Sequence, residues 1–282
     1  MKKHLITFGG SAYDKITERV VDTYKQFGAD TFTIYDEPWA IESGFKQENQ
    51  WLWDHRGLKN EGGGRGYGWF SWKPKCISHA LSLAQPGDFV LYLDADTYPV
   101  ADFSVLFNLC YKEGGHLAFM ATGKLGPLCN RQWVKRECFQ CMGLDNEEYW
   151  HGPHAVCRFM VFRNPMSTDD PTDVFQFLNE WQQHCLDHQC QTFDFDPAIQ
   201  LPGPHGDGPF ASFREHRTEQ AIYSLLCIKY GRRLYREACE FGNECAQDWH
   251  RYPQLFTQVG SSGPKSERGS SFRDQFPVGL FR

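Results

Sequence analysis

Residues 88–96 read Asp-Phe-Val-Leu-Tyr-Leu-Asp-Ala-Asp, and this stretch decides how the rest of the chain is interpreted. An apolar run suited to a buried strand ends abruptly at two carboxylates, Asp94 and Asp96. A strand that is apolar on both faces is typical of a sheet covered by helices, and ligands of such sheets bind beyond the carboxyl ends of the strands. Because the two carboxylates alternate with Ala95, both can point to one side and offer oxygen ligands to a hard cation. The stretch therefore predicts a cation site.

The composition indicates a globular protein whose principal ligand is not nucleic acid. The chain has 282 residues, of which 41% are hydrophobic and 23% charged, which suffices for one large α/β domain or two small ones. The net charge is −6, and no block of lysine and arginine is present. A nucleic-acid backbone requires clustered positive charge, so this class of ligand is disfavoured.

The sequence also predicts a cytoplasmic protein without a transmembrane segment. The apolar part of residues 1–10 is too short for a signal peptide. No stretch approaches the roughly eighteen apolar residues of a membrane span. The 11 cysteines are an odd number and are scattered through the chain, so we expect reduced thiols.

The chain opens with a strand, a helix and a second strand, a pattern that is typical of a parallel sheet. The three segments are residues 4–8, 13–27 and 31–35. Further helices are expected over 41–58, 74–83, 173–188 and 214–230, and further strands over 89–93, 117–121 and 159–162. We expect one mostly parallel α/β domain over residues 1–259. Residues 260–282 are rich in glycine and serine and are expected to form a flexible tail.

Three segments together resemble one enzyme family. Residues 90–96, V-L-Y-L-D-A-D, resemble the D-x-D motif of nucleotide-sugar glycosyltransferases with the GT-A fold. Residues 66–74, G-Y-G-W-F-S-W-K-P, resemble the Gly-aromatic-Trp-Lys-Pro segment that precedes this strand in some bacterial and viral members. Residues 213–220 resemble the H-R-x-D-Q start of the acceptor-side helix, with Glu219 in the place of the aspartate. The three segments follow one another in the order of the family.

The resemblance implies a GT-A-like α/β fold and a divalent cation, Mn²⁺ or Mg²⁺, that bridges a carboxylate and the diphosphate of the sugar nucleotide. A cation in this position stabilises the negative charge that develops on the departing diphosphate. The resemblance makes Asp96 the direct ligand and places Asp94 at the ribose, or at the metal through water. Many members add a histidine near the C-terminus, and His250 is the candidate by position.

Five other residues are candidates for the site. Arg65 and Lys73 lie beside glycines and a predicted helix start, and either diphosphate contacts or structural roles explain them. Trp72 is suited to stacking on the donor, although large aromatic residues more often pack in the core. An inverting enzyme needs a base next to the acceptor hydroxyl, and Glu219 is the first candidate and Glu215 the second. Capping of the helix N-terminus is the alternative role for these two carboxylates.

Cys138 and Cys141 form a C-x-x-C motif, with His151 and His154 downstream. These spacings match known zinc sites only loosely. The sequence favours two ordinary buried thiols.

The sequence thus predicts transfer of a sugar from a nucleotide-sugar donor, a UDP-sugar, to a hydroxyl of a sugar, a glycan or a lipid-linked acceptor. One alternative is a metal-dependent phosphohydrolase or nucleotidyltransferase that uses the same carboxylates, although such sites need more ligands than this pair. A second alternative is a non-catalytic sugar-nucleotide-binding protein.

Overall fold

A computed structural model gives the fold of the chain. The structure describes residues 1–9, 18, 20–21, 24–54, 67–123, 126–167, 170, 172–194, 196, 212–243, 254–260 and 263–264.

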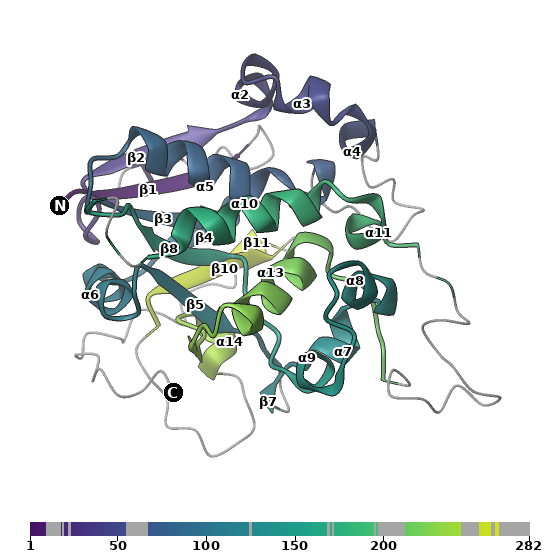
Figure 1. Ribbon diagram of the computed structural model, residues 1–282. Helices are drawn as coiled ribbons and strands as arrows, with labels where there is room; N and C mark the ends of the chain where they lie inside the picture. Colours follow the sequence, from purple (N-terminus) through teal and green to yellow (C-terminus); the bar gives the residue numbers. More distant parts are fainter. Residues whose placement is uncertain are drawn as a thin grey trace.

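A six-stranded sheet in the order β2-β1-β3-β8-β5-β9 forms the centre of the molecule (Figure 1). Its strands are β1 (Lys3–Phe8), β2 (Thr31–Tyr35), β3 (Phe89–Asp94), β5 (His116–Met120), β8 (Phe159–Arg163) and β9 (Leu234–Arg236). Strand β8 is antiparallel to β3 and β5, and the other neighbouring pairs are parallel. The prediction of a mostly parallel sheet flanked by helices is therefore confirmed.

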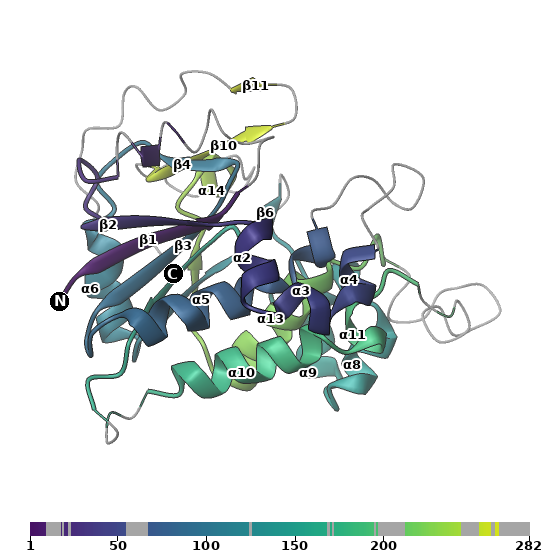
Figure 2. The ribbon, with the colours of Figure 1, turned by 90° about the horizontal axis from the view of Figure 1, so that it is seen from above.

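Strand β3 is buried on both faces, as its apolar sequence predicts. Val90 and Tyr92 pack on one side in a core shared with three long helices, and Leu91 and Leu93 pack on the other side with α6. The three helices are α5 (Trp72–Leu83), α10 (Val174–Cys185) and α13 (Thr218–Lys229), and α6 spans Ser104–Lys112. Figure 2 shows α5 and α10 side by side along one face of the sheet. Side chains alternate between the two faces of β3, so the strand separates two layers of the core. By the same alternation Asp94, at the end of the strand, lies on the face that carries α5 and α13.

A small second sheet in the order β11-β10-β4 lies next to the end of β3. Its strands are β4 (Thr97–Pro99), β10 (Phe256–Gly260) and β11 (Gly263–Pro264). In the antiparallel pair of β4 and β10, Gln258 is opposite Thr97. This pairing brings a segment close to the C-terminus up to the turn that carries Asp96. Strand β11 falls within the predicted tail, whose residues 265–282 lie outside the described residues.

The remaining elements are short. They are α2 (Glu37–Glu42), α3 (Phe45–Glu48), α4 (Gln50–Asp54), η2 (Tyr67–Phe70), β6 (Thr122–Gly123), β7 (Gly126–Pro127), α7 (Asn130–Trp133), α8 (Arg136–Cys141), α9 (Glu147–His151), α11 (His188–Gln191) and α14 (Glu240–Asn243). None of the helices in the described ranges has the length and apolarity that a bilayer crossing requires.

Three predicted helices differ from the structure. The helix expected over 41–58 is broken where Gly44 adopts a left-handed φ of 77°, a conformation that glycine adopts without steric cost. The helix expected over 214–230 begins at Thr218, and the helix expected over 173–188 ends at Cys185. Most of the helix expected over 13–27 lies outside the described residues.

Candidate active site

Asp94 ends β3 and is held by two neighbours. The Tyr92 hydroxyl donates a hydrogen bond of 2.7 Å to Asp94 Oδ1, and Lys73 Nζ lies 2.9 Å from the same oxygen. The Asp94 side chain is 26% exposed, and Oδ2 has no hydrogen-bond partner among the described residues. Within the described part of the chain, one carboxylate oxygen is therefore fixed by the protein and the other is available to a ligand.

Lys73 lies beneath this carboxylate and is 2% exposed. Its ammonium group contacts Asp94, Glu219 Oε1 at 3.1 Å and the carbonyl oxygen of Cys157 at 3.2 Å. A lysine has three N–H donors, so these contacts use all of them. Burial acts to lower the pKa of Lys73, but the attraction of the two carboxylates outweighs it and the pKa is raised. Lys73 is a permanent buried cation that orients Asp94.

Glu219 forms the other half of this ion-pair cluster, which consists of Lys73, Asp94 and Glu219. It is 4% exposed, and its second oxygen, Oε2, accepts a hydrogen bond of 2.8 Å from the Thr218 hydroxyl. Glu219 lies in the first turn of α13, next to the buried ammonium group of Lys73 at the start of α5. Both carboxylate oxygens thus have protein partners, which suits a residue that positions Lys73.

Strained backbone precedes both Lys73 and Glu219. Trp69, Phe70 and Thr218 have φ values of 45°, 62° and 44°, although none of them is glycine. Such left-handed conformations cost about 1–3 kcal/mol each, and they are concentrated at active sites and ligand-binding sites. The strain therefore marks the same place in the fold as the carboxylate pair.

Asp96 lies in the turn after β3 and faces the small sheet. Its Oδ2 accepts a hydrogen bond of 2.6 Å from Gln258 Nε2, and its Oδ1 accepts one of 3.2 Å from the Thr97 hydroxyl. The amide oxygen of Gln258 accepts in turn from the Arg158 guanidinium at 2.9 Å. Arg158 also forms an ion pair with the buried carboxylate of Glu237, with 3.9 Å between Arg158 Nε and Glu237 Oε2. An ion pair from Glu237 to Arg158 therefore continues through two hydrogen bonds, from Arg158 to Gln258 and from Gln258 to Asp96.

The site carries excess negative charge. Burial raises the pKa of Asp96, and repulsion from Asp94 raises it further, while Gln258 and Arg158 offset only part of this effect. A raised pKa means that the ionised carboxylate is destabilised where it lies, and a bound cation removes this destabilisation. Mn²⁺ and Mg²⁺ prefer oxygen ligands of this kind. The two carboxylates therefore fit a divalent cation.

The structure places the other predicted site residues as follows. Trp72 is 4% exposed and stacks on Phe8, with ring centroids 3.9 Å apart, so one ring face is already covered in the core. Glu215 is half-buried and pairs with Arg217 at 2.8 Å. Arg65 and His250 lie outside the described residues. Of the predicted site residues, the structure joins Asp94, Lys73 and Glu219 by direct contacts and places Asp96 within electrostatic reach of Asp94.

The structure adds three residues that the sequence interpretation does not single out. Tyr92 lies two positions before Asp94, so the period of two along a strand is a signal that places both on one face. Arg158 precedes the predicted strand over 159–162, but the sequence gives no indication of its partner. Gln258 carries no local signal, because its role depends on the pairing of β4 and β10.

The fold and the site together define an α/β protein with two neighbouring carboxylates, Asp94 and Asp96, at the carboxyl end of a central strand. No family model and no curated protein sequence matches the chain. Among solved structures, the chain is similar to mouse xyloside xylosyltransferase 1, with a TM-score of 0.42 and 10% identity, covering 94% of this chain and 99% of that one. It is also similar to the glycosyltransferase GlyE of Streptococcus pneumoniae TIGR4, with a TM-score of 0.39 and 12% identity, covering 99% of this chain and 57% of that one. Because both TM-scores are below 0.5, the function is inferred from the residues of this chain alone.

Proposed function

We propose that the chain is a metal-dependent glycosyltransferase that moves a sugar from a nucleoside-diphosphate donor, a UDP-sugar, to an acceptor hydroxyl. The observation that carries the proposal is the carboxylate pair at the end of β3. Asp94 keeps an oxygen available to a ligand, and Asp96 bears negative charge that its neighbours do not balance. The three sequence segments that resemble nucleotide-sugar glycosyltransferases support the same assignment.

In this proposal Asp96 is the direct ligand of Mn²⁺ or Mg²⁺, and Asp94 contacts the ribose, or the metal through water. The cation supplies the positive charge that stabilises the departing diphosphate. The protein contributes rigidity, because Lys73 and Tyr92 fix one oxygen of Asp94 and Gln258 fixes one oxygen of Asp96. Such supporting contacts orient metal ligands and tune their basicity.

The contacts also divide the roles of the predicted catalytic residues. Lys73 has no N–H donor left for a diphosphate, so we assign it to the positioning of Asp94. Glu219 is anchored on Lys73 and is assigned to the same task. Glu215 is the more exposed of the two carboxylates that were candidates for the base, with 38% of its side chain accessible. Arg65 and His250 stay predictions as donor and metal contacts.

The test is a thermal-shift screen of UDP and UDP-sugars with and without Mn²⁺, followed by assays for release of nucleoside diphosphate. A ligand present at one hundred times its Kd stabilises the native state by about 2.7 kcal/mol, a shift that is readily measured. We expect stabilisation by UDP only when Mn²⁺ is present. Asp96→Ala should abolish this shift, transfer and donor hydrolysis while the near-ultraviolet circular dichroism is retained.

Asp30→Asn is the matched control, because Asp30 is an exposed aspartate at the opposite end of the sheet strands, where it accepts from the Lys3 amide. It should keep both the cation-dependent shift and turnover. Unchanged turnover in Asp96→Ala would refute the proposal. Release of phosphate from phosphate esters would identify the phosphohydrolase alternative, and donor binding without turnover against a broad acceptor panel would identify a binding protein.

A further inference from the structure

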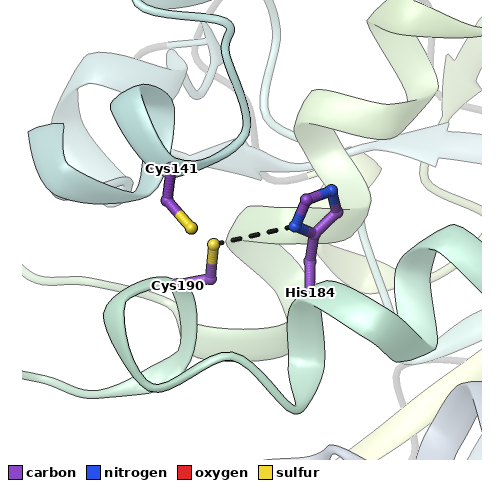
Figure 3. A group of neighbouring side chains, drawn as sticks. All are labelled: Cys141, His184 and Cys190. Atoms are coloured by element: carbon purple, nitrogen blue, oxygen red, sulfur yellow. Dashed lines mark hydrogen bonds between the residues drawn. The ribbon is translucent and has the colours of Figure 1, made fainter.

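Three potential metal ligands from three separate helices meet on the side of the sheet that carries α10. Cys141 ends α8, His184 lies in the last turn of α10, and Cys190 lies in α11. Their ligand atoms all lie within 4.8 Å of one another, and Cys190 Sγ is 3.8 Å from His184 Nδ1. Figure 3 shows the three side chains pointing toward a common centre.

The spacing of these atoms matches a tetrahedral metal site. With Zn–S bonds of about 2.3 Å and Zn–N bonds of about 2.0–2.1 Å, neighbouring ligand atoms are about 3.6–3.8 Å apart. The distance of 3.8 Å between Cys190 Sγ and His184 Nδ1 is close to the value of about 3.6 Å for a sulfur–nitrogen pair. Thiolate and imidazole are the ligands that zinc prefers, whereas the oxygen ligands of Asp94 and Asp96 suit Mn²⁺ or Mg²⁺.

Cys138, one helical turn before Cys141, is the candidate for a fourth ligand. Residues three apart on a helix lie on one face, so both thiols of the C-x-x-C motif can face the same ion. The Cys138 side chain is fully buried, and its thiol, which contacts Met142 Sδ at 3.9 Å, lies outside the group of three and would turn toward Cys190 to bind the ion. We propose that Cys138, Cys141, His184 and Cys190 form a structural zinc site.

The surroundings of His184 fit this role. With Nδ1 facing the thiols, Nε2 lies 3.6 Å from Glu180 Oε1, one turn earlier on α10. Histidines that bind metals usually direct the second ring nitrogen at a carboxylate, which fixes the tautomer and the ring orientation. The Tyr230 hydroxyl donates a hydrogen bond of 2.7 Å to Glu180 Oε2, so this carboxylate is itself held in place.

The charge of the site is also balanced. Zinc with three thiolates and one neutral imidazole carries one net negative charge, and three thiol protons are released on binding. Burial lowers the pKa of Lys135, and the attraction of Cys138, Glu137 and Cys190 opposes part of this effect. Its Nζ is held by the Thr192 hydroxyl at 3.0 Å and the Asp194 carbonyl at 2.8 Å. A fixed positive charge therefore lies next to the thiolates.

Four protein ligands leave no open coordination position, which is typical of a structural zinc ion. This zinc ion connects α8, α10 and α11, and α11 in turn contacts both strained segments of the candidate active site. The Cys190 carbonyl accepts a hydrogen bond of 2.7 Å from His216, two residues before Thr218. The Gln191 amide donates one of 2.9 Å to the Trp69 carbonyl. The inferred zinc site does not depend on the proposed function, but it supports the segments that position Lys73 and Glu219.

The experiment measures zinc by inductively coupled plasma mass spectrometry in the full chain, purified without chelators under reducing conditions. We expect one zinc ion per chain, with less than a tenth of this amount in Cys141→Ser and His184→Ala. Cys110→Ser is the matched control, since Cys110 is a fully buried thiol on α6, on the opposite face of the sheet. It should retain the full amount.

Reconstitution of the wild-type chain with Co²⁺ keeps the inference testable even where a variant fails to fold. A tetrahedral cobalt site with three thiolates gives intense visible bands and a sulfur-to-cobalt charge-transfer band. Cys138→Ser removes one of the three thiolates and should weaken the charge-transfer band by about a third. Wild-type protein without zinc and without this cobalt spectrum would overturn the inference. A disulfide between Cys141 and Cys190 in protein purified under reducing conditions would also overturn it.

Discussion

Replacing Lys73 by methionine tests the ion-pair cluster of Lys73, Asp94 and Glu219. The Nζ–O distance to Glu219 is 3.1 Å, for which the Coulomb attraction at an effective dielectric constant of 20 is about 5 kcal/mol before desolvation. The attraction to Asp94 at 2.9 Å is screened further, because that side chain is partly exposed. Breaking a buried pair costs about 3–5 kcal/mol, since the remaining carboxylate stays buried without its partner. We expect Lys73→Met to lower the free energy of unfolding by this amount, out of a typical total of about 5–15 kcal/mol.

A double-mutant cycle with Glu219→Gln separates the ion pair from lost packing. In the double variant no uncompensated charge remains at Glu219, so its loss should be smaller than the sum of the two single losses by about 2–3 kcal/mol. Urea unfolding followed by tryptophan fluorescence gives the four free energies. Lys46→Met is the matched control, because Lys46 pairs with Glu37 at 2.6 Å where both side chains stay in contact with solvent, and its loss should cost less, about 1 kcal/mol. A loss below about 1 kcal/mol in Lys73→Met, or additive single losses, would refute the role assigned to the cluster.

Three further outcomes follow from the structure. In metal-free protein Asp96→Asn should be at least as stable as the wild type at neutral pH. Burial and Asp94 raise the folded pKa of Asp96, so the ionised carboxylate destabilises the wild type above that pKa and no longer does so on acidification. Melting curves of the variant and the wild type across pH measure this difference. Gln258→Met removes the donor that lowers the pKa of Asp96, so the acidic limb of the pH–rate profile should move to higher pH, and an unmoved limb contradicts the contact. Gly152→Ala would bring a Cβ atom against Ile228 Cδ1, the far end of a flexible side chain, and to 3.1 Å from the Glu148 carbonyl oxygen, so it should cost at most about 1 kcal/mol in thermal unfolding, and a larger loss would show that Ile228 does not move aside.

The central sheet could be predicted from the sequence because its signals are local. The apolar run that ends at Asp94 describes β3 without reference to any other segment, and the observed β2 coincides with the predicted residues 31–35. The start of α5 was also close to the prediction, since a proline suits the first turn of a helix. The position of the carboxylate pair at the end of a central strand follows directly from this part of the fold.

The partners of the site residues could not be predicted, because they are fixed by tertiary contacts. Nothing near Lys73 in the sequence indicates that both Asp94 and Glu219 hold its ammonium group. Arg158 stands next to a predicted strand, but its link to Asp96 through Gln258 requires a register between strands more than 150 residues apart.

The Cys138–Cys141 motif shows the same limit. The histidines closest after it in sequence are His151 and His154, and the sequence interpretation weighed these two as zinc ligands. In the structure His154 is buried elsewhere and its Nδ1 lies 3.0 Å from Asn130 Oδ1, while His184 faces the Cys190 thiol. The relevant histidine could be found only after the helices had been placed side by side.

The hydrogen bond from Gln258 to Asp96 has a consequence for the synthesis of the protein. The strands of the central sheet all precede residue 237, so a nascent chain on the ribosome contains them before β10 has emerged. The sheet and its core can therefore form first, whereas the turn that carries Asp96 acquires this partner only after residue 258 has been synthesised. A chain that ends before residue 258 retains the strands of the central sheet but leaves Asp96 without this hydrogen bond, so we expect any function that depends on Asp96 to require strand β10.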